Sequence, residues 1–86
     1  MTEPISVRVD LKIPAAYVKY RVGTSVETRD IIDGGTVAYD LNESGEIIGV
    51  EILGIDQSIH VETARQFAHD HRLAFPRDLG GNLVAA

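Results

Sequence analysis

Most of the first 53 residues alternate between apolar and polar side chains, which is the pattern of strands that bury one face. In "ISVRVDLKI", Val7, Val9 and Leu11 share one face and charged side chains take the other. Similar runs follow at "AYVKYRVG", "SVETRDII", "TVAYDL" and "GEIIGVEIL". Turn residues separate the runs, at Pro14, "DGG" and "NESG". The sequence therefore predicts an antiparallel β-meander of four to five strands within residues 5–54.

The pattern changes to a helical period in "SIHVETARQFAHDHRL". With Ser58 as the N-cap, the spacing predicts an α-helix over 58–72. Pro76 and the glycine pair that follows it end regular structure, which leaves an irregular tail over 73–86. The predicted fold is a single α+β domain over 1–86, with one C-terminal helix on the sheet. The apolar stripe of this helix consists of Val61, Ala64, Phe67 and Ala68.

Strand parity bears on Glu51, the carboxylate within the apolar part of the fifth run. Folding the chain back at "NESG" pairs Glu51 with Thr36 and places both on the polar face. Folding the first two runs back at Pro14 pairs Val9 with Tyr20. The alternative for Glu51 is a buried acid retained for chemistry, but an unpaired buried carboxylate costs several kcal/mol. We therefore expect Glu51 to be exposed to solvent.

Charge and composition argue against several classes of protein. The formal net charge is −5, with 8 Lys and Arg against 13 Asp and Glu. Affinity for nucleic acids and anionic membranes depends on basic side chains, so we expect neither as a partner. With no cysteine, the chain has no disulfide, thiolate metal site or catalytic thiol. No segment resembles a signal peptide or a membrane span, and we expect a cytoplasmic protein.

The length of the chain favours association with a second subunit. A chain of 86 residues buries only about 60–65% of the surface that its unfolded form exposes. Apolar side chains also occupy both faces of the fifth run, where Ile47 and Leu53 share the face of Glu51. We therefore expect a non-catalytic protein that self-associates through its sheet or helix as a homo-oligomer, with a dimer favoured.

Half of the basic side chains lie on the polar face of the first two predicted strands. These are Arg8, Lys12, Lys19 and Arg21. They form a candidate surface for a protein partner with acidic groups. The alternative is a solvated face with cross-strand pairs such as Asp10 with Lys19.

Three histidines, His60, His69 and His71, lie in or beside the predicted helix. His60 and His71 share a stripe but are about 16 Å apart along it, so they cannot bind one metal ion within one chain. His69 and His71 point away from each other. A small enzyme or metal protein would use these histidines with Glu62, and this remains the third alternative. We assign no catalytic, cofactor-binding or metal-binding residue.

The segment from Ala15 to Leu53 resembles a small bacterial family known as domain of unknown function 2283. The resemblance is carried by "YVKYRVG", "VETRDI" and "GTVAYDLNESGEIIGVEIL". It implies a short antiparallel sheet and no established activity. Its genes often lie beside small toxin-like genes, which implies an antitoxin-like partner role. The net acidity of the chain favours a basic protein as that partner. The chain departs from the family at Ala16-Tyr17, where members usually have Asp-Ala. The residues that match the family motif are Thr28, Tyr39, Asp40, Gly45, Gly49 and Glu51.

Overall fold

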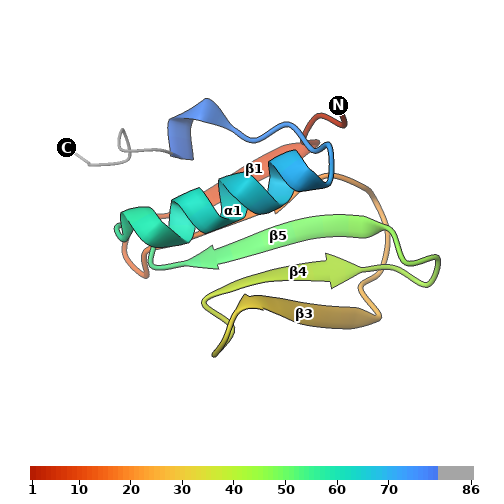
Figure 1. Cartoon of the computed structure of the whole chain (residues 1–86), viewed down its shortest axis with the longest axis horizontal. Helices are drawn as coiled ribbons and strands as arrows, with labels where there is room; N and C mark the ends of the chain where they lie inside the picture. The colour runs from red at the N-terminus through yellow and green to blue at the C-terminus, as the bar shows by residue number, and fades with distance from the viewer. Residues whose placement is uncertain (80–86) are drawn as a thin grey trace.

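The computed structural model describes residues 1–79 and contains a five-stranded antiparallel sheet with one α-helix across one of its faces (Figure 1). The strand order is β1-β2-β5-β4-β3. The prediction of an α+β fold with an antiparallel sheet and a C-terminal helix is confirmed. The elements are β1 (Ser6–Asp10), β2 (Ala15–Lys19), β3 (Glu27–Ile32), β4 (Val37–Leu41), β5 (Ile47–Leu53), α1 (Ser58–Asp70) and the 3₁₀ helix η1 (Arg77–Leu79).

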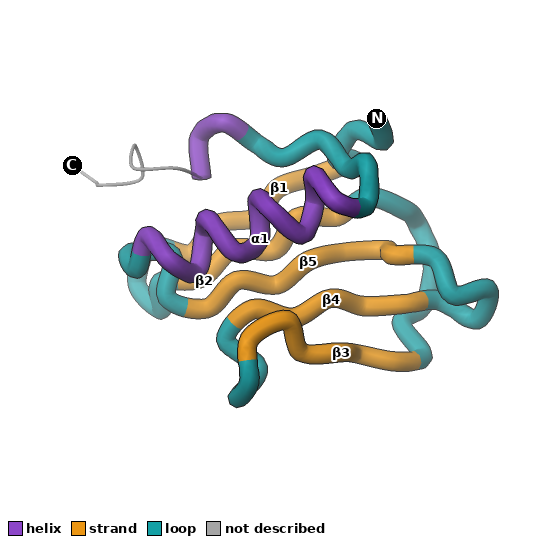
Figure 2. Tube along the Cα trace, in the orientation of Figure 1, coloured by secondary structure: helices purple, strands orange, loops and turns teal. Residues whose placement is uncertain are grey.

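β1 and β2 are neighbours in the sheet, and β5, β4 and β3 follow them in the reverse of their order in the chain. β5 therefore lies between β2 and β4. After β2 the chain passes along the end of the sheet and enters β3 at the opposite edge (Figure 2). The strands β3, β4 and β5 then return toward β2. As a result β5 is paired on both sides, whereas β1 and β3 are the two edge strands among the described residues.

The first hairpin turns earlier than the sequence predicted. Val9 lies opposite Ala16 rather than Tyr20. The Asp10 carboxylate accepts the backbone N–H of Lys12 at 2.9 Å and closes a turn that continues to Pro14. Because this turn lies outside both strands, the pairing moves along β2 by an even number of residues. An even displacement leaves every side chain on its predicted face.

The pairing of β4 with β5 also differs from the prediction. Glu51 lies opposite Ala38 instead of Thr36. The turn closes one residue wider than predicted, with a hydrogen bond from Asn42 N–H to Glu46 C=O. The register then shifts once more at a bulge at Ile48. Two single-residue displacements restore the original parity, and Glu51 is exposed, as its parity predicted.

The core lies between the sheet and α1. Short side chains on the helix, Ala64 and Ala68, are fully buried and let the helix backbone approach the strands closely. The ring of Phe67 packs on Tyr39 of β4, with the ring centroids 4.6 Å apart. The core of buried residues includes Ala16, Val18, Tyr20, Val37, Val50, Ile52, Ile55, Val61, Ala64 and Ala68.

The helix is slightly shorter than predicted at its C-terminal end. It ends at Asp70, and Arg72 adopts a positive φ of 57° that prevents continuation. At the other end, Ser58 is the first helical residue and Gln57 takes the N-cap position, without a side-chain capping bond. Ser58 is therefore not the N-cap. None of the described helices is long and apolar enough to cross a membrane.

The segment after the helix packs against the rest of the chain. Leu73 and Leu79 are buried, and the Tyr20 hydroxyl donates a hydrogen bond of 2.9 Å to the Ala74 carbonyl. Thr2 forms a bridge with Leu73, which ties the N-terminal segment to the same region. The predicted irregular tail thus contains a short η1 helix and core residues up to position 79, and residues 80–86 lie outside the described residues.

Neighbouring residues of β5 provide a test of this packing. Ile52 is completely buried, whereas Leu53 on the other face is 39% exposed. We expect Ile52→Ala to lower the free energy of unfolding by about 2–5 kcal/mol, because it leaves a cavity. Leu53→Ala should lower it by less than about 1 kcal/mol. Urea unfolding of the two variants measures both values, and equal losses would contradict the assigned faces.

Candidate functional site

The face of the sheet opposite α1, which we call the open face, has short side chains around one tyrosine. Tyr17 of β2 lies opposite Arg8 of β1 and Glu51 of β5. No helix of the described chain lies across this face (Figure 2). Ala38 and Gly49 are the small residues beside it. This is the surface on which the matched family motif and the polar face of the first hairpin meet.

A hydrogen-bonded network on the open face connects four strands. The Tyr17 hydroxyl donates to one oxygen of the Asp40 carboxylate at 2.8 Å. The Thr28 hydroxyl donates to the other oxygen at 2.6 Å. To reach Asp40, the Tyr17 ring passes directly over Gly49 on the intervening strand, where any Cβ would collide with the ring. Gly49 therefore permits a close approach that links β2 to β4 and β3.

The environment of Tyr17 determines its protonation. Burial, the hydrogen bond to Asp40 and the negative charges of Asp40 and Glu51 raise the pKa of the phenol well above its usual value of 10. The hydroxyl therefore stays protonated further into the alkaline range than that of a free tyrosine, and it acts as a hydrogen-bond donor. Such a group cannot serve as a general base or a nucleophile near neutral pH.

The structure brings together most of the residues on which the family resemblance was based. Thr28, Asp40, Gly49 and Glu51 all lie on the open face. Tyr39 lies on the opposite face against α1, and Gly45 lies in the β4–β5 turn with a positive φ of 78°. The alternation of the sequence predicted no role for Tyr17, whose hydroxyl completes the network. A glycine within an otherwise apolar strand is the signal that could have found it, because it indicates close approach by a neighbour.

The four basic residues proposed as a partner surface do not form one patch. Arg8 and Lys19 lie on the open face, opposite Tyr17 and Ser6 respectively. Lys12 lies in the β1–β2 turn, and Arg21 follows β2 and forms an ion pair with Glu46 at 3.8 Å. The suggested pair of Asp10 with Lys19 is wrong, because the shifted register places other residues opposite each of them.

The β1 edge is a row of exposed apolar side chains. All five residues of β1 are exposed, and Val7 and Val9 are each 40% exposed although they lie on the same face of the sheet as the core. β1 is not among the strands that α1 mainly contacts, which are β3, β4 and β5. Exposed apolar side chains continue beyond both ends of the strand, at Ile5 before it and at Leu11 and Ile13 after it.

The opposite edge of the sheet, at β3, has features that disfavour pairing with another strand. Glu27, Arg29 and Asp30 place three charges on its exposed surface, and the first two form an ion pair at 2.7 Å. The pairing with β4 is irregular between Asp30 and Ile32. Charges and irregular pairing are the usual means by which an edge strand avoids association. By comparison, β1 has two charges of opposite sign and regular pairing.

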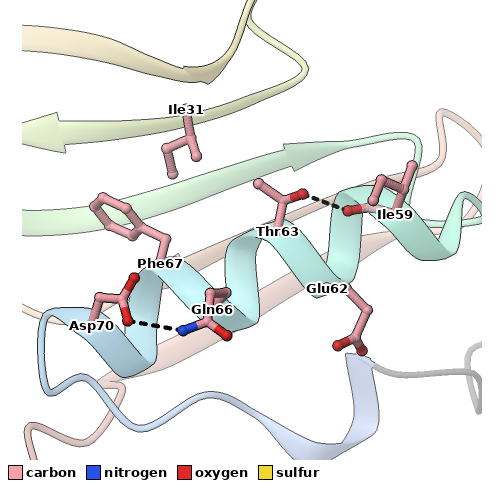
Figure 3. A pocket seen from close by; sticks show the side chains of 7 residues that line it. All are labelled: Ile31, Ile59, Glu62, Thr63, Gln66, Phe67 and Asp70. Carbon is pink, nitrogen blue, oxygen red and sulfur yellow. Dashed lines mark hydrogen bonds between the residues drawn. The ribbon is translucent and has the colours of Figure 1, made fainter.

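A shallow groove of about 490 Å³ lies between α1 and β3 (Figure 3). Ile31 of β3 and Phe67 of α1 face each other across it, as Figure 3 shows. Its polar side chains are paired within the helix: Gln66 donates to Asp70 at 2.8 Å, and Thr63 donates to a backbone carbonyl. These polar groups do not converge on a common point, so the groove offers no arrangement for catalysis.

The three histidines occupy separate environments. His60 Nδ1 lies 3.0 Å from the Gly54 carbonyl, and His71 Nδ1 lies 2.9 Å from the Phe67 carbonyl. His69 is exposed beside Asp70. Within residues 1–79, no group of three or more His, Cys, Asp or Glu side chains is close enough to hold a metal ion.

Comparison with known proteins returned no match to a family model, to a curated protein or to a solved structure.

The contact between Tyr17 and Gly49 can be tested by substitution. We expect Gly49→Ala to destabilise the protein by about 1–3 kcal/mol, because the new methyl group displaces the Tyr17 ring. In a Tyr17→Ala background the same change should have little effect or stabilise, because alanine suits a strand interior better than glycine. Urea unfolding of the four proteins gives the coupling. Equal effects in both backgrounds would show that the ring does not cover Gly49.

Stability should fall at alkaline pH because of Tyr17 and Tyr20. Burial, with the negative charge of Glu3, raises the pKa of Tyr20 to about 12, and the pKa of Tyr17 is also raised. Both values exceed the unfolded value of about 10, so this stability is fully present below about pH 10 and is lost as the pH rises through the folded-state values. Tyr17→Phe and Tyr20→Phe should each reduce the difference between urea unfolding at about pH 8 and about pH 11. Identical pH dependence in all three proteins would contradict this.

Proposed function

We propose that this protein is a non-catalytic interaction module that self-associates through the free edge of β1. The observation behind the proposal is the exposed apolar row of the first hairpin, in which Val7 and Val9 are each 40% exposed although they share the face of the core. An edge strand of this kind, with unpaired backbone groups and apolar side chains, is a template for pairing with another chain. The short chain supports the proposal, because a second subunit would extend its small core.

The role of the polar network is consistent with a module of this type. The Tyr17 phenol is held protonated, and Asp40 accepts hydrogen bonds from Tyr17 and Thr28. These contacts hold the strands of the sheet together, so a second chain joining at β1 would meet a sheet of defined shape. The proposal also places the module in the cytoplasm, a reducing compartment with which a chain without cysteine is compatible.

A second candidate function is antitoxin-like binding to a basic protein partner, which the net acidity of the chain favours. The observation in its favour is the charge of the open face, where four carboxylates accompany two basic side chains. The carboxylates belong to Asp10, Asp30, Asp40 and Glu51, and the basic groups belong to Arg8 and Lys19. A surface of net negative charge attracts a basic partner and repels an acidic one. This candidate requires no contact between copies of the chain, so measurement of the mass separates it from the first.

Light scattering during size-exclusion chromatography tests the proposed self-association. We expect the unmodified chain to have the mass of two chains at micromolar concentration. Val9→Lys should shift it to the mass of one chain, because a charge on the apolar row opposes burial. Val26→Lys is the matched control, since Val26 is an exposed valine outside β1, at 56% exposure, and this variant should stay dimeric. A monomeric unmodified chain would overturn the proposal.

A further inference from the structure

We infer that two copies of the chain pair β1 with β1 in antiparallel orientation, about a two-fold axis that passes beside Val9. This inference rests on the proposed self-association and adds its register and its partner contacts. The axis is perpendicular to the sheet, so the two sheets become one continuous sheet. Both α1 helices then lie on the same side, and the two open faces join on the other.

The backbone of β1 favours such a partner. On its inner side β1 pairs with β2 over its whole length, and on its outer side the described chain offers no strand. In antiparallel pairing, alternate residues of an edge strand direct both N–H and C=O away from the sheet. A second β1 presents the same groups in the reverse direction and satisfies them without any change in the fold. This is why edge strands commonly pair with copies of themselves.

Charge selects the register of this pairing. With the axis at Val9, Arg8 lies opposite the partner's Asp10, and Asp10 lies opposite the partner's Arg8. Two ion pairs therefore form across the interface, on the side of the open face. An axis at Arg8 or at Asp10 instead places like charges directly opposite each other, which is destabilising. An axis at Val7 places Arg8 opposite the partner's Ser6 and Asp10 opposite the partner's Pro4, so neither charge meets one of opposite sign.

The apolar side chains indicate the same centre. The exposed apolar residues of the first hairpin recur at every second position and are symmetric about Val9. An axis at Val9 brings Val7, which is 40% exposed, beside the partner's Leu11, which is the first residue of the β1–β2 turn and is 58% exposed. The ion pairs between Arg8 and Asp10 select this register, and the exposed apolar side chains are compatible with it. The full apolar row is Ile5, Val7, Val9, Leu11 and Ile13.

Reversal of the two charges tests the register. Arg8→Asp and Asp10→Arg each place like charges opposite each other, and each should weaken the dimer by about tenfold or more. An equimolar mixture of the two variants should form heterodimers with an affinity near that of the unmodified chain, because every pair is then attractive. Native mass spectrometry measures the species present. Lys19→Asp is the control, since Lys19 lies on β2 away from the edge, and it should remain dimeric.

Two further variants make the result independent of folding defects. Asp10 also accepts hydrogen bonds in the β1–β2 turn, so Asp10→Asn, which keeps an acceptor oxygen, should weaken the dimer while the unfolding curve stays close to that of the unmodified chain. Val9→Cys introduces the only cysteine of the chain. Opposed residues of paired strands have Cα atoms about 4.5–5.5 Å apart, which suits a disulfide, so oxidation should cross-link two copies.

The outcomes separate the register from the proposed function. Single charge variants that stay fully dimeric, or a mixture that fails to restore the dimer, would overturn the pairing at Val9 and leave self-association through another contact in place. An unmodified chain that is monomeric would overturn self-association itself, and with it this inference. The register would be established if each single charge variant forms a weak dimer, if the mixture of the two restores the affinity, and if Val9→Cys is cross-linked on oxidation.

Discussion

The pairing of β5 on both of its sides is the constraint on which the rest of the structure depends. β5 joins the first hairpin to the β3–β4 hairpin, and its Val50 and Ile52 have no exposed surface. These two side chains face α1, so the helix packs over the centre of the sheet. The helix of 13 residues makes its main contacts with β5, β4 and β3, whereas every residue of β1 is exposed.

The open face has a second constraint, which is the lack of a side chain at Gly49. The Tyr17 ring occupies that space and reaches Asp40, two strands away. Thr28 adds the fourth strand through the same carboxylate. The network holds together strands that are distant in the sequence, on a face with no helix to pack against. It thus complements the hydrophobic core on the other face, and it keeps the phenol protonated in a role that is structural.

The two edges of the sheet show how similar strands acquire different properties. β3 has three charges, an internal ion pair and an irregular register, all of which oppose pairing with another chain. β1 has an apolar row and only Arg8 and Asp10, whose signs are complementary when the strand meets itself in reverse. The difference between the edges favours β1 over β3 as the strand through which the proposed self-association takes place. The charge of the open face favours a basic partner on a surface that such a dimer leaves free.

The sequence by itself determined which residues form strands and which form the helix, because periods of two and 3.6 are local properties. It also determined which face of the sheet each strand residue lies on, including the exposure of Glu51. Each of the two registers differs from the predicted one by an even number of residues, so no side chain changed face. The register itself depended on the Asp10 turn and the bulge at Ile48, which no periodicity reports. Only the tertiary structure decided that β5 lies beside β2, that Tyr17 covers Gly49, and that β1 lies outside the helix. These are contacts between residues far apart in the chain, and they depend on how one short helix packs against a sheet of five strands.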